Sequence, residues 1–516
     1  MVRRNFIFKT IREVFEKYGY QPIETPAMEN SETLMGKYGE EGDRLIFKIL
    51  DSGDFMAPVK PEIMEEDFSP DITTSKGMNV AFSFFPQPPF FSLKVGKGKY
   101  QSKEERSKII KGWLSSQPRL FDSKKTASQI SEKALRYDLT VPFARYVVQH
   151  QNEITFPFKR YQIQPVWRAD RPQKGRYREF FQCDADVIGS NSLLNEVELV
   201  QIIDEVFVKL KISIDIKINN RKILRGIIEE LGINIVMEAD VISALDKLDK
   251  IGTLKVKEEL IAKGLSDDQA KDVIDFIDIK LANNKPSLTN LGDDVFSMFH
   301  NSESGRKGLS ELHEVLKCFE YFGPQWLSET KKSAKFEGKL KLNGELTPDF
   351  FLARGLHYYT GAIFEVKAND VQMGSICGGG RYDNLTGIFG LPNISGVGIS
   401  FGIDRIFDVM NELNLFESIG LTASITKVML AHFGEEERNF CIGIGAQLRS
   451  AGINTEVYPD VTKKISKQFE YANKKQIPFV IVVGGDEMKT GELTLKNMSS
   501  GEQVKIKINE IIEKFK

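Results

Sequence analysis

Hydrophobic residues near the amino terminus recur at the spacing of an α-helix. Phe6, Ile7, Ile11, Val14 and Phe15 fall on one face of such a helix, and a glycine follows where helices commonly end. We therefore predict that the chain starts with an amphipathic helix whose apolar face packs against a core.

Extended segments follow this helix. Residues 21–28 contain two prolines, which confine a strand there to a sheet edge because proline has no N–H, and residues 45–50 read as another strand. Apolar and polar positions alternate over 134–189, with turn residues between the runs, which predicts a hairpin-rich antiparallel sheet. A second β-rich stretch is predicted at 350–401, followed by a helix at 402–413.

Helical patterns dominate between the two β-rich stretches. We predict a helix at 193–209, a strand at 212–218, where isoleucines alternate with other residues, and mostly amphipathic helices over 221–340. The helical block therefore interrupts a β-rich domain.

Strands and helices alternate in the last part of the chain, from residue 426 onward. The predicted order is strand 428–431, helix 436–452, strand 454–457, helix 465–475, strand 479–483 and hairpin 492–508. Such alternation is typical of a small α/β domain, and a length of about 90 residues lies within the usual range for one.

Residues 52–128 differ in composition from their surroundings. An acidic stretch is followed by a stretch rich in Phe and Pro and then by one rich in Lys and Arg. Such a shift is typical of an insertion on a domain rather than its core. A surface loop and an RNA-contacting module both remain open for it.

Composition narrows the class of protein. The 516 residues favour two to four domains at roughly 150 residues each. With 41% hydrophobic and 28% charged residues, disorder as the main state is excluded. A net charge of −2 provides no global attraction for nucleic acid, so any such contact needs a local patch. No apolar run is long enough for a membrane span, and we expect a cytoplasmic protein.

Cysteines and histidines give no sign of a metal site. The 4 cysteines are far apart and form no C-x-x-C pair, and the 5 histidines show no ligand spacing such as H-E-x-x-H. We therefore expect neither a disulfide framework nor a structural metal.

A cluster of cations lies in a predicted hairpin loop. Arg168, Arg171, Lys174, Arg176 and Arg178 lie close together around a Pro and a Gly, and only two acidic residues offset them. Such a loop suits a polyanion such as a nucleoside triphosphate, because arginine makes bidentate hydrogen bonds with phosphate. Taken alone, the stretch is equally compatible with a solvated basic turn.

Glycine-rich segments further along bring more arginines. Arg354 in L-A-R-G-L-H-Y-Y-T-G and Arg381 in G-G-G-R-Y-D-N lie next to glycines, which allow the backbone to approach a ligand closely. The segment G-V-G-I-S-F-G-I-D-R ends at Arg405. Its glycine spacing and the lack of a surrounding βαβ unit argue against a dinucleotide-binding fingerprint.

In this order, the four segments resemble histidyl-tRNA synthetases, which are class II aminoacyl-tRNA synthetases. Residues 168–182, with R-P-Q-K-G-R-Y-R, are similar to motif 2, residues 396–405 to motif 3 and residues 18–50 to motif 1. The two glycine-rich segments are similar to the histidine-specific signatures R-G-L-D-Y-Y and G-G-R-Y-D. Residues 135–145 match the family's L-R-Y-D-L-T-V-P-F-A-R segment.

The resemblance implies an α+β fold, with helices flanking the antiparallel sheet of a class II synthetase. A catalytic domain would span 1–420, with insertions at 52–128 and about 221–340, and an α/β anticodon-binding domain would span 426–516. The implied activity is ATP-dependent activation of histidine to histidyl-adenylate, then transfer of the histidyl group to the 3′ end of tRNA(His). It further implies Mg²⁺ with the ATP and, from motif 1, a homodimer.

Five residues would bind ATP by correspondence with the family. Arg168 would hold the α-phosphate and the substrate carboxylate, Arg176 and Arg405 the outer phosphates, and Phe180 would stack on adenine. Arg354 would approach the α-phosphate from the opposite side. The step is mostly positioning and electrostatics, for which fixed arginines and Mg²⁺ are suited.

The resemblance also implies a histidine pocket. Its residues would be Asp138, Thr140, Gln182, Asp186, Tyr358 and Tyr359. The first three would take the α-amino end, whereas Asp186 and Tyr359, with Tyr358 nearby, would read the imidazole ring. Gln182 would also be catalytic, together with Arg168 and Arg354. Such a pocket rejects apolar amino acids, since its polar groups would be left unpaired.

One residue departs from the family pattern, and one lysine cluster stays ambiguous. His357 replaces the usual Asp of R-G-L-D-Y-Y, which puts a titratable group where the family has a carboxylate. Lysines on and beside the predicted helix 465–475 are candidate anticodon-arm contacts or a solvated face. They are Lys463, Lys464, Lys467, Lys474 and Lys475.

Two other function classes are weighed against the enzyme. A catalytically silent paralogue, such as the histidine-sensing regulatory subunit of an ATP phosphoribosyltransferase, resembles the catalytic domain only, whereas this chain keeps a C-terminal domain and the key arginines. An RNA-binding module without catalysis does not explain the Asp138, Gln182, Asp186 and Tyr359 set.

Overall fold

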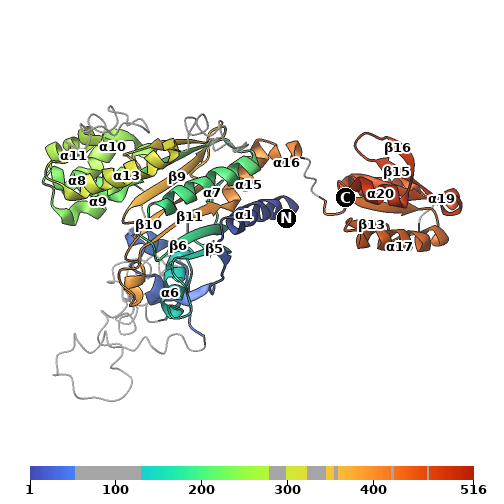
Figure 1. Ribbon diagram of the computed structural model, residues 1–516, viewed down its shortest axis with the longest axis horizontal. Coiled ribbons are helices and arrows are strands. Elements are labelled where there is room, and N and C mark those ends of the chain that lie inside the picture. Colours follow the sequence, from blue (N-terminus) through green and yellow to red (C-terminus); the bar gives the residue numbers. More distant parts are fainter. Residues whose placement is uncertain are drawn as a thin grey trace, which may run out of the picture.

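The computed structural model describes residues 1–52, 130–277, 298–321, 344–353, 358–419, 424–461 and 464–515. A larger body built on a twisted sheet and a smaller C-terminal unit are visible in Figure 1. Nearly all of the predicted insertion 52–128 lies outside these residues, as do Arg354, His357 and Lys463.

An eight-stranded sheet, counted over the described residues, forms the centre of the larger body. Its strands, in spatial order, are β1 (Gln21–Pro22), β5 (Phe158–Trp167), β6 (Glu179–Ile188), β11 (Gly396–Gly402), β10 (Cys377–Tyr382), β9 (Ala362–Ala368), β7 (Ile214–Asn220) and β8 (Glu345–Pro348). The inner pairs are antiparallel, and the pairs at the two edges are parallel. The prediction of an antiparallel class II sheet is confirmed, and the edge position expected of Pro22 is observed.

Helices pack on one face of this sheet. They are α1 (Val2–Lys17), α7 (Leu194–Leu210) and α15 (Ile403–Glu412), with the short α16 (Leu415–Ser418) beyond them. The apolar stripe predicted for the first helix is the side of α1 that packs against α7, α15 and the sheet. Its residues Ile7, Ile11, Val14 and Phe15 are fully inaccessible to solvent. Burying such side chains is the main favourable term in folding, at roughly 1.5 to 3 kcal/mol each.

One segment predicted as part of the hairpins is helical instead. Residues 140–149 form α6 (Thr140–Gln149), which buries Val141, Phe143 and Val147 at helical spacing. Pro142 lies in the first turn, where a missing N–H breaks no helical hydrogen bond. The prediction of continuous hairpins over 134–189 was therefore wrong at this point, because short apolar runs do not by themselves distinguish a strand from a helix.

A small sheet beside α6 contains the rest of the amino-terminal segment. Its order is β2 (Met28–Asn30), β4 (Lys133–Leu135) and β3 (Lys48–Ile49), and the short helices α2 (Ser31–Leu34) and α3 (Gly39–Leu45) lie between β2 and β3 in the chain. The strand predicted at 45–50 is therefore only two residues long, because α3 extends to its first position.

Helices occupy the segment between β7 and β8. In the described part of the chain they are α8 (Arg221–Glu230), α9 (Glu238–Leu245), α10 (Leu248–Ala262), α11 (Asp267–Asp275) and α13 (Glu303–Tyr321). Figure 1 places them together at one end of the sheet. They lie where the sequence predicted helices, and the domain boundaries stay predictions.

The C-terminal unit is a small α/β fold. Its sheet has the order β13 (Thr455–Val457), β12 (Val428–His432), β14 (Phe479–Val483), β15 (Glu492–Asn497), β16 (Gln503–Lys507). The first three strands are parallel, and β15 and β16 form an antiparallel hairpin. The helices are α17 (Glu435–Ser450), α18 (Ile465–Lys474), α19 (Gly485–Thr490) and α20 (Ile508–Phe515). The last two are short, and sequence periodicity did not predict them.

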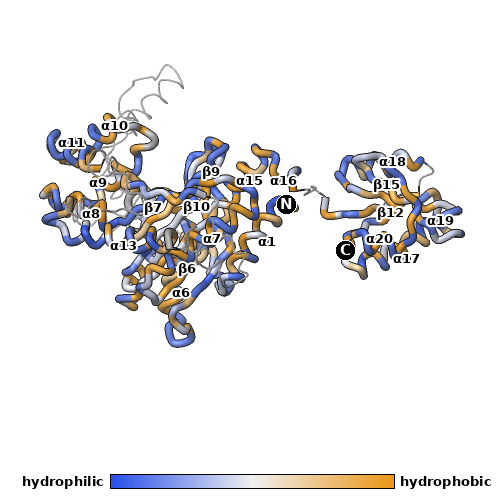
Figure 2. The backbone as a smooth tube through the Cα atoms, turned by 45° about the horizontal axis from the view of Figure 1, so that its top comes forward, coloured by the Kyte–Doolittle hydropathy of each residue, from blue (hydrophilic) through white to orange (hydrophobic). Residues whose placement is uncertain are grey.

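Hydropathy follows this architecture. Figure 2 shows apolar stretches along the elements that pack inside each body and mixed stretches along the outer helices. Across the described residues, we find no helix with the length and apolar character needed to traverse a bilayer.

Candidate active site

A cavity of about 1340 Å³ opens over the face of the sheet opposite α1 and α7. Strand β6 explains why this face is polar. Side chains alternate between the two faces of a strand, so Phe181, Cys183 and Ala185 pack toward the helices. The intervening side chains line the cavity; they are Phe180, Gln182, Asp184 and Asp186.

This cavity gathers the predicted site residues. Its lining includes Asp138, Thr140, Arg168, Arg176, Phe180, Gln182, Asp186, Tyr358, Tyr359 and Arg405. Arg354 lies outside the described residues. Their location in one cavity is an observation, and the individual binding roles stay predictions.

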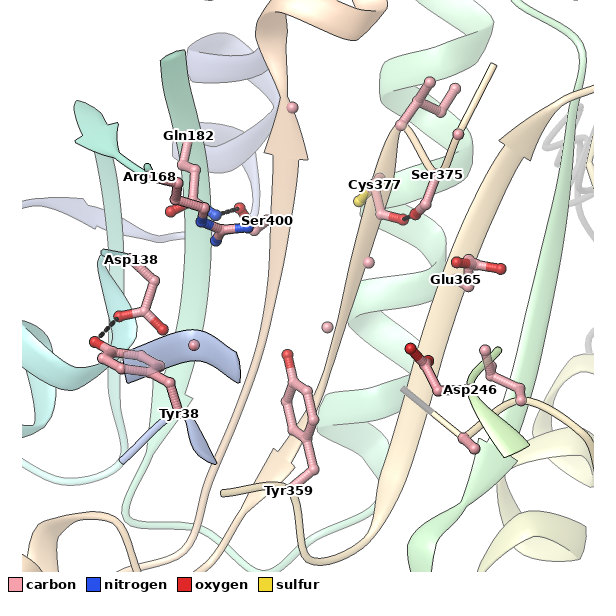
Figure 3. A pocket seen from close by; sticks show the side chains of 18 of the residues that line it. Tyr38, Asp138, Arg168, Gln182, Asp246, Tyr359, Glu365, Ser375, Cys377 and Ser400 are labelled. Atoms are coloured by element: carbon pink, nitrogen blue, oxygen red, sulfur yellow. Dashed lines mark hydrogen bonds between the residues drawn. The ribbon is translucent and has the colours of Figure 1, made fainter. Parts of the chain in front are cut away.

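Arginines gather at the mouth of the cavity, where the hairpin between β5 and β6 begins. The guanidinium of Arg168 lies 4.1 Å from the ring centroid of Tyr137 and 5.1 Å from that of Phe180, and its Nε donates to the carbonyl of Tyr137 at 3.1 Å. Stacking on two rings holds the planar group in one orientation while leaving its charge at the cavity. Figure 3 shows Arg168 beside Gln182.

Arg405 connects the same hairpin to the loop before β10. Its Nε donates to the carbonyl of Gly175 at 2.7 Å and its Nη1 to the carbonyl of Ser375 at 2.6 Å. Gly175 has φ of 73°, and a Cβ there would come within 2.8 Å of the Met373 sulfur, so both conformation and space favour glycine. Arg176 is 46% exposed and pairs with Asp170 at 3.5 Å.

The floor of the cavity is acidic and buried. Asp186 accepts a hydrogen bond of 2.5 Å from the Tyr382 hydroxyl and forms an ion pair of 2.8 Å with Arg160, which is itself fully buried. Gly398 lies opposite, and a Cβ there would approach Asp186 Oδ1 to 2.0 Å. The glycine of the motif 3 segment is therefore required to leave room for this carboxylate. Burial raises the pKa of Asp186.

Asp138 lies between two tyrosines just before α6. Its Oδ1 accepts from the Tyr38 hydroxyl and its Oδ2 from that of Tyr358, both at 2.9 Å, and the Val141 N–H donates to Oδ1 at 3.2 Å. Figure 3 shows the bond to Tyr38. Burial raises the pKa of Asp138, and these three hydrogen bonds oppose that rise. Sequence reasoning missed Tyr38, for which no local pattern gave a signal.

Gln182 and Asp184 line the cavity, and each has a buried acceptor oxygen without a hydrogen-bond partner in the described part of the chain. The two acceptors are Gln182 Oε1 and Asp184 Oδ1. Gln182 Nε2 donates to Ser400 Oγ at 2.9 Å. Burial raises the pKa of Asp184 to about 8. Sequence reasoning missed Asp184, although the two-residue period of β6 places it on the same face as Gln182 and Asp186.

The opposite wall was not predicted at all. Glu365, Ser375 and Cys377 lie across the pocket from Arg168, with Asp246 further along the same side (Figure 3). Further lining residues belong to the inserted helices α8, α9 and α10. Sequence patterns give no signal for this wall, because it depends on how the inserted helices pack beside β9.

One arginine beside a glycine run does not reach the cavity. Arg381 is buried and binds Glu196 through Nε at 2.5 Å and Nη2 at 2.6 Å, and its Nη1 donates to the Ser395 hydroxyl at 2.5 Å. Gly378 and Gly379 beside it do line the cavity, and the close backbone approach to a ligand expected there stays a prediction. Arg381 ties β10 to α7 and the loop before β11.

No group of three or more His, Cys, Asp and Glu residues in the described segments is arranged to hold a metal ion. The cysteines Cys183, Cys318, Cys377 and Cys441 are all free thiols. The absence of a resident metal stays a prediction for the whole chain.

An antiparallel sheet that presents a motif 2 hairpin, a glycine-containing motif 3 strand and a polar cavity between them defines the catalytic fold of class II aminoacyl-tRNA synthetases. Residues 119–406 match the family model described as histidyl-tRNA synthetase, and residues 427–516 match the anticodon binding domain. The chain belongs to the histidyl-tRNA synthetase family, as the sequence motifs implied.

Individual relatives agree with this assignment. The chain is 48% identical to a histidine–tRNA ligase of Phocaeicola vulgatus, over 99% of this chain and 95% of the relative. A solved histidyl-tRNA synthetase structure from Nostoc sp. PCC 7120 has a TM-score of 0.67 at 28% identity, covering 99% of this chain and 94% of that one. The predicted activity is confirmed at this level: the chain activates histidine with ATP and charges tRNA with it.

A further structural neighbour bears on the silent-paralogue alternative. The structure described as an ATP phosphoribosyltransferase regulatory subunit/histidyl-tRNA synthetase from Bacillus halodurans has a TM-score of 0.58 at 16% identity, with 94% of each chain covered. Such low identity shows a shared fold alone. The distinction between enzyme and regulator therefore rests on the ligase relatives and on the residues of the site.

Proposed function

We propose that histidine and ATP react in this cavity to form histidyl-adenylate, and that the histidyl group then passes to the 3′ end of tRNA(His). The observation that carries the proposal is one strand, β6, which connects a mouth lined by arginines to a buried acidic floor. ATP is a polyanion and the α-amino group of histidine is a cation, so the two ends of the cavity match the two substrates.

At the mouth, Arg168 holds the α-phosphate and the substrate carboxylate, and Arg176 and Arg405 hold the outer phosphates. Phe180 stacks on adenine, and Arg354 approaches the α-phosphate from the other side. Support comes from the ring stacking of Arg168, which fixes its orientation before substrate arrives. Preorganised charge of this kind stabilises the transition state at no cost of reorganisation.

On the floor, Asp138, Thr140 and Gln182 receive the α-ammonium group, and Asp186 and Tyr359, with Tyr358 nearby, read the imidazole. The Tyr358 hydroxyl donates to Asp138 and the Tyr382 hydroxyl donates to Asp186. These hydrogen bonds orient the two carboxyl groups, which supports the assignment. A pocket with fixed polar partners discriminates strongly against amino acids that cannot satisfy them.

In the first step, a carboxylate oxygen of histidine attacks the α-phosphorus of ATP, and the bond to the bridging oxygen of pyrophosphate breaks. In the second, a terminal ribose hydroxyl of tRNA attacks the activated carbonyl, and AMP leaves. ATP enters as its Mg²⁺ complex. Since Mg²⁺ commonly binds through substrate phosphates with few protein ligands, the lack of a three-ligand cluster in the described residues fits this mode.

The assembly is proposed to be a cytoplasmic homodimer. The motif 1 segment 18–50 supports this through its exposed apolar side chains, with Met28 58% and Leu50 56% accessible in the single chain. Burial of such side chains against a second copy is favourable. Sedimentation at low concentration tests the dimer, and a stable, active monomer contradicts it.

The C-terminal unit, residues 426–516, is proposed to bind the anticodon arm of the tRNA. Among the candidate lysines on α18, Lys474 pairs with Glu470 at 2.7 Å and Lys475 with Glu456 at 2.9 Å, so these two are partly neutralised. Deleting the unit should weaken aminoacylation and spare adenylate formation in a folded remnant. Loss of both activities in such a remnant contradicts the proposed domain division.

Histidine-dependent exchange of labelled pyrophosphate into ATP tests the central proposal. Exchange with histidine, and none with the other amino acids, is the expected result. No exchange from folded protein that still binds histidine would instead favour the regulatory paralogue.

A further inference from the structure

Asp184 lies in the acidic floor and has no role in the mechanism described above. It sits on β6 midway between Gln182 and Asp186, and its side chain lines the cavity although the residue is only 2% exposed. Residues two apart on a strand are separated by about 6.5 Å on the same face. Asp184 therefore lies between the residues proposed to bind the ammonium group and those proposed to bind the imidazole ring.

The floor contains more negative than positive groups. Asp138, Asp184 and Asp186 are all buried, and the fully buried cations that act on Asp184 are Arg160 and Arg136. Arg160 makes its direct ion pair with Asp186, at 2.8 Å. Asp184 Oδ1 has no hydrogen-bond partner among the described residues. A buried carboxylate oxygen without a donor is costly, so the group either holds a proton or awaits a donor.

Two acceptor oxygens, one on Asp184 and one on Gln182, receive no hydrogen bond from the residues that the structure describes. Ser400 lies opposite Asp184 on β11, hydrogen-bonds to it, and accepts from Gln182 Nε2 at 2.9 Å. Within the described residues, Asp184 Oδ1 and Gln182 Oε1 are buried and have no donor. Both oxygens of Asp138, by contrast, already accept from Tyr38 and Tyr358. Two neighbouring acceptors without donors match a ligand that carries several N–H groups.

We infer that Asp184 is a further substrate-binding residue, whose Oδ1 accepts a hydrogen bond from the α-ammonium group of histidine together with Gln182 Oε1. This inference rests on the proposed function, because it needs histidine on the floor. The ammonium has three N–H donors and one positive charge, so it satisfies both acceptors and adds a positive charge beside three buried carboxyl groups.

Binding is then coupled to the release of a proton. In the free protein, burial raises the pKa of Asp184 to about 8, so the carboxyl is mostly protonated at neutral pH. The charged and titratable groups that act on it are Arg136, Arg160, Asp138, Cys183, Asp186 and Tyr382. Burial raises the pKa of Asp186 as well, but Arg160 and Tyr382 bind it directly and oppose that rise. The arriving ammonium lowers the pKa of Asp184 and expels its proton.

Isothermal titration of the full chain with three ligands tests the inference. Histidine and histidinol carry the ammonium group, whereas 3-(imidazol-4-yl)propanoate is histidine without it. At pH 7.5, titrations in buffers of different ionisation enthalpy should show net proton release with the first two ligands and none with the third, because the pKa of Asp184 is raised in the free protein.

Asp184→Asn should abolish this proton release and weaken histidine and histidinol binding about 30-fold, which is typical for loss of a charge-assisted hydrogen bond, while sparing the propanoate. Glu365→Gln is the matched control, because it removes a carboxylate from the opposite wall of the same cavity. It should leave all three affinities and the proton release unchanged.

Three results would overturn the inference. Equal weakening of all three ligands by Asp184→Asn would assign the carboxylate to the imidazole ring, and unchanged binding would make it a purely structural acid. Proton release that persists in Asp184→Asn would place the proton elsewhere. Since wild-type histidine binding and pyrophosphate exchange are measured separately, failure of the proposed function is distinguishable from failure of this inference.

Discussion

The mouth and the floor of the cavity lie at two ends of one strand, yet they handle charge in opposite ways. At the mouth, the hairpin 168–178 carries cations that are partly or fully exposed, whereas β6 becomes buried from Cys183 onward. The floor holds buried carboxyl groups, two of them fixed by tyrosine hydroxyls, beside the buried Arg160 and Arg136. The exposure gradient along a single strand thus separates the end proposed to bind phosphate from the end proposed to bind the amino acid.

The two ends of the cavity are expected to respond differently to salt and to substitution of their charged residues. Exposed cations lose little solvation on binding phosphate, and salt screens them. Buried charges are insensitive to salt, but removal of one partner leaves the other unpaired at high cost. Substitutions at each end can therefore break or sharpen the comparison.

The largest effect is expected at the junction of the two ends. Arg168→Ala removes the guanidinium that stacks on Tyr137 and Phe180, and histidine-dependent pyrophosphate exchange should fall about 1000-fold, as for loss of a preorganised transition-state donor. Arg168→Lys keeps the charge without the planar fork and should fall in between. A rate within tenfold of wild type for Arg168→Ala would remove this residue from the chemical step.

The next effect concerns the buried ion pair of the floor. Arg160→Met leaves Asp186 without its cation and should lower the free energy of unfolding by about 3 kcal/mol, measured by urea denaturation. Adding Asp186→Asn removes the stranded charge and should restore much of that loss. If the two substitutions simply add, the pair is not coupled and the floor does not depend on mutual compensation.

A smaller effect is expected in the pH dependence of stability. The folded-state pKa of Asp184 is raised to about 8, above the value of about 3.9 in an unfolded chain. Only the folded state keeps the proton between these values, so this group makes stability fall as pH rises from about 4 to about 8. Asp184→Asn removes that slope. Its melting temperature relative to wild type should therefore rise by several degrees between pH 5 and pH 8.5.

Calorimetry at the two pH values measures the shift, and Glu365→Gln serves as the control for loss of a carboxylate at the cavity. A constant difference between Asp184→Asn and wild type across this range would show that the carboxyl is already ionised in the folded protein.

Sequence reasoning performed well where a pattern is local and less well where a partner is distant. The cation-rich hairpin is a local pattern and was predicted to bind a polyanion, whereas Gln182 and Asp186 on β6 were selected by the family resemblance; both line the cavity that the hairpin borders. The role of Arg381 could not be predicted, because Glu196, the acid that binds it, lies 185 residues away in the chain. Nothing near either residue in the sequence indicates that pairing.

Tertiary packing also determined the secondary structure where the hydrophobic periodicity was ambiguous. Residues 140–149 became helical because α6 buries its apolar side against the small cluster around Tyr38 and Leu385, a contact that only the folded chain reveals. The wall formed by α9 and α10 was missed for the same reason. Asp184 is different, because the two-residue period of β6 already predicts that its side chain lies on the same face as Gln182 and Asp186. The family motifs do not single it out.

The smallest effect is expected at the most exposed cation of the cavity. Arg176 is 46% exposed and already pairs with Asp170, so its proposed contact with the outer phosphates should be worth only about 1 kcal/mol. Arg176→Ala should raise the KM for ATP about fivefold at low salt, and the difference from wild type should shrink in 0.3 M KCl at roughly 6 Å screening length. Arg171→Ala is the matched control, because this exposed arginine of the same hairpin does not line the cavity. An Arg176 effect that salt leaves unchanged would mean that the mouth binds phosphate through desolvated contacts, and the contrast with the floor would then disappear.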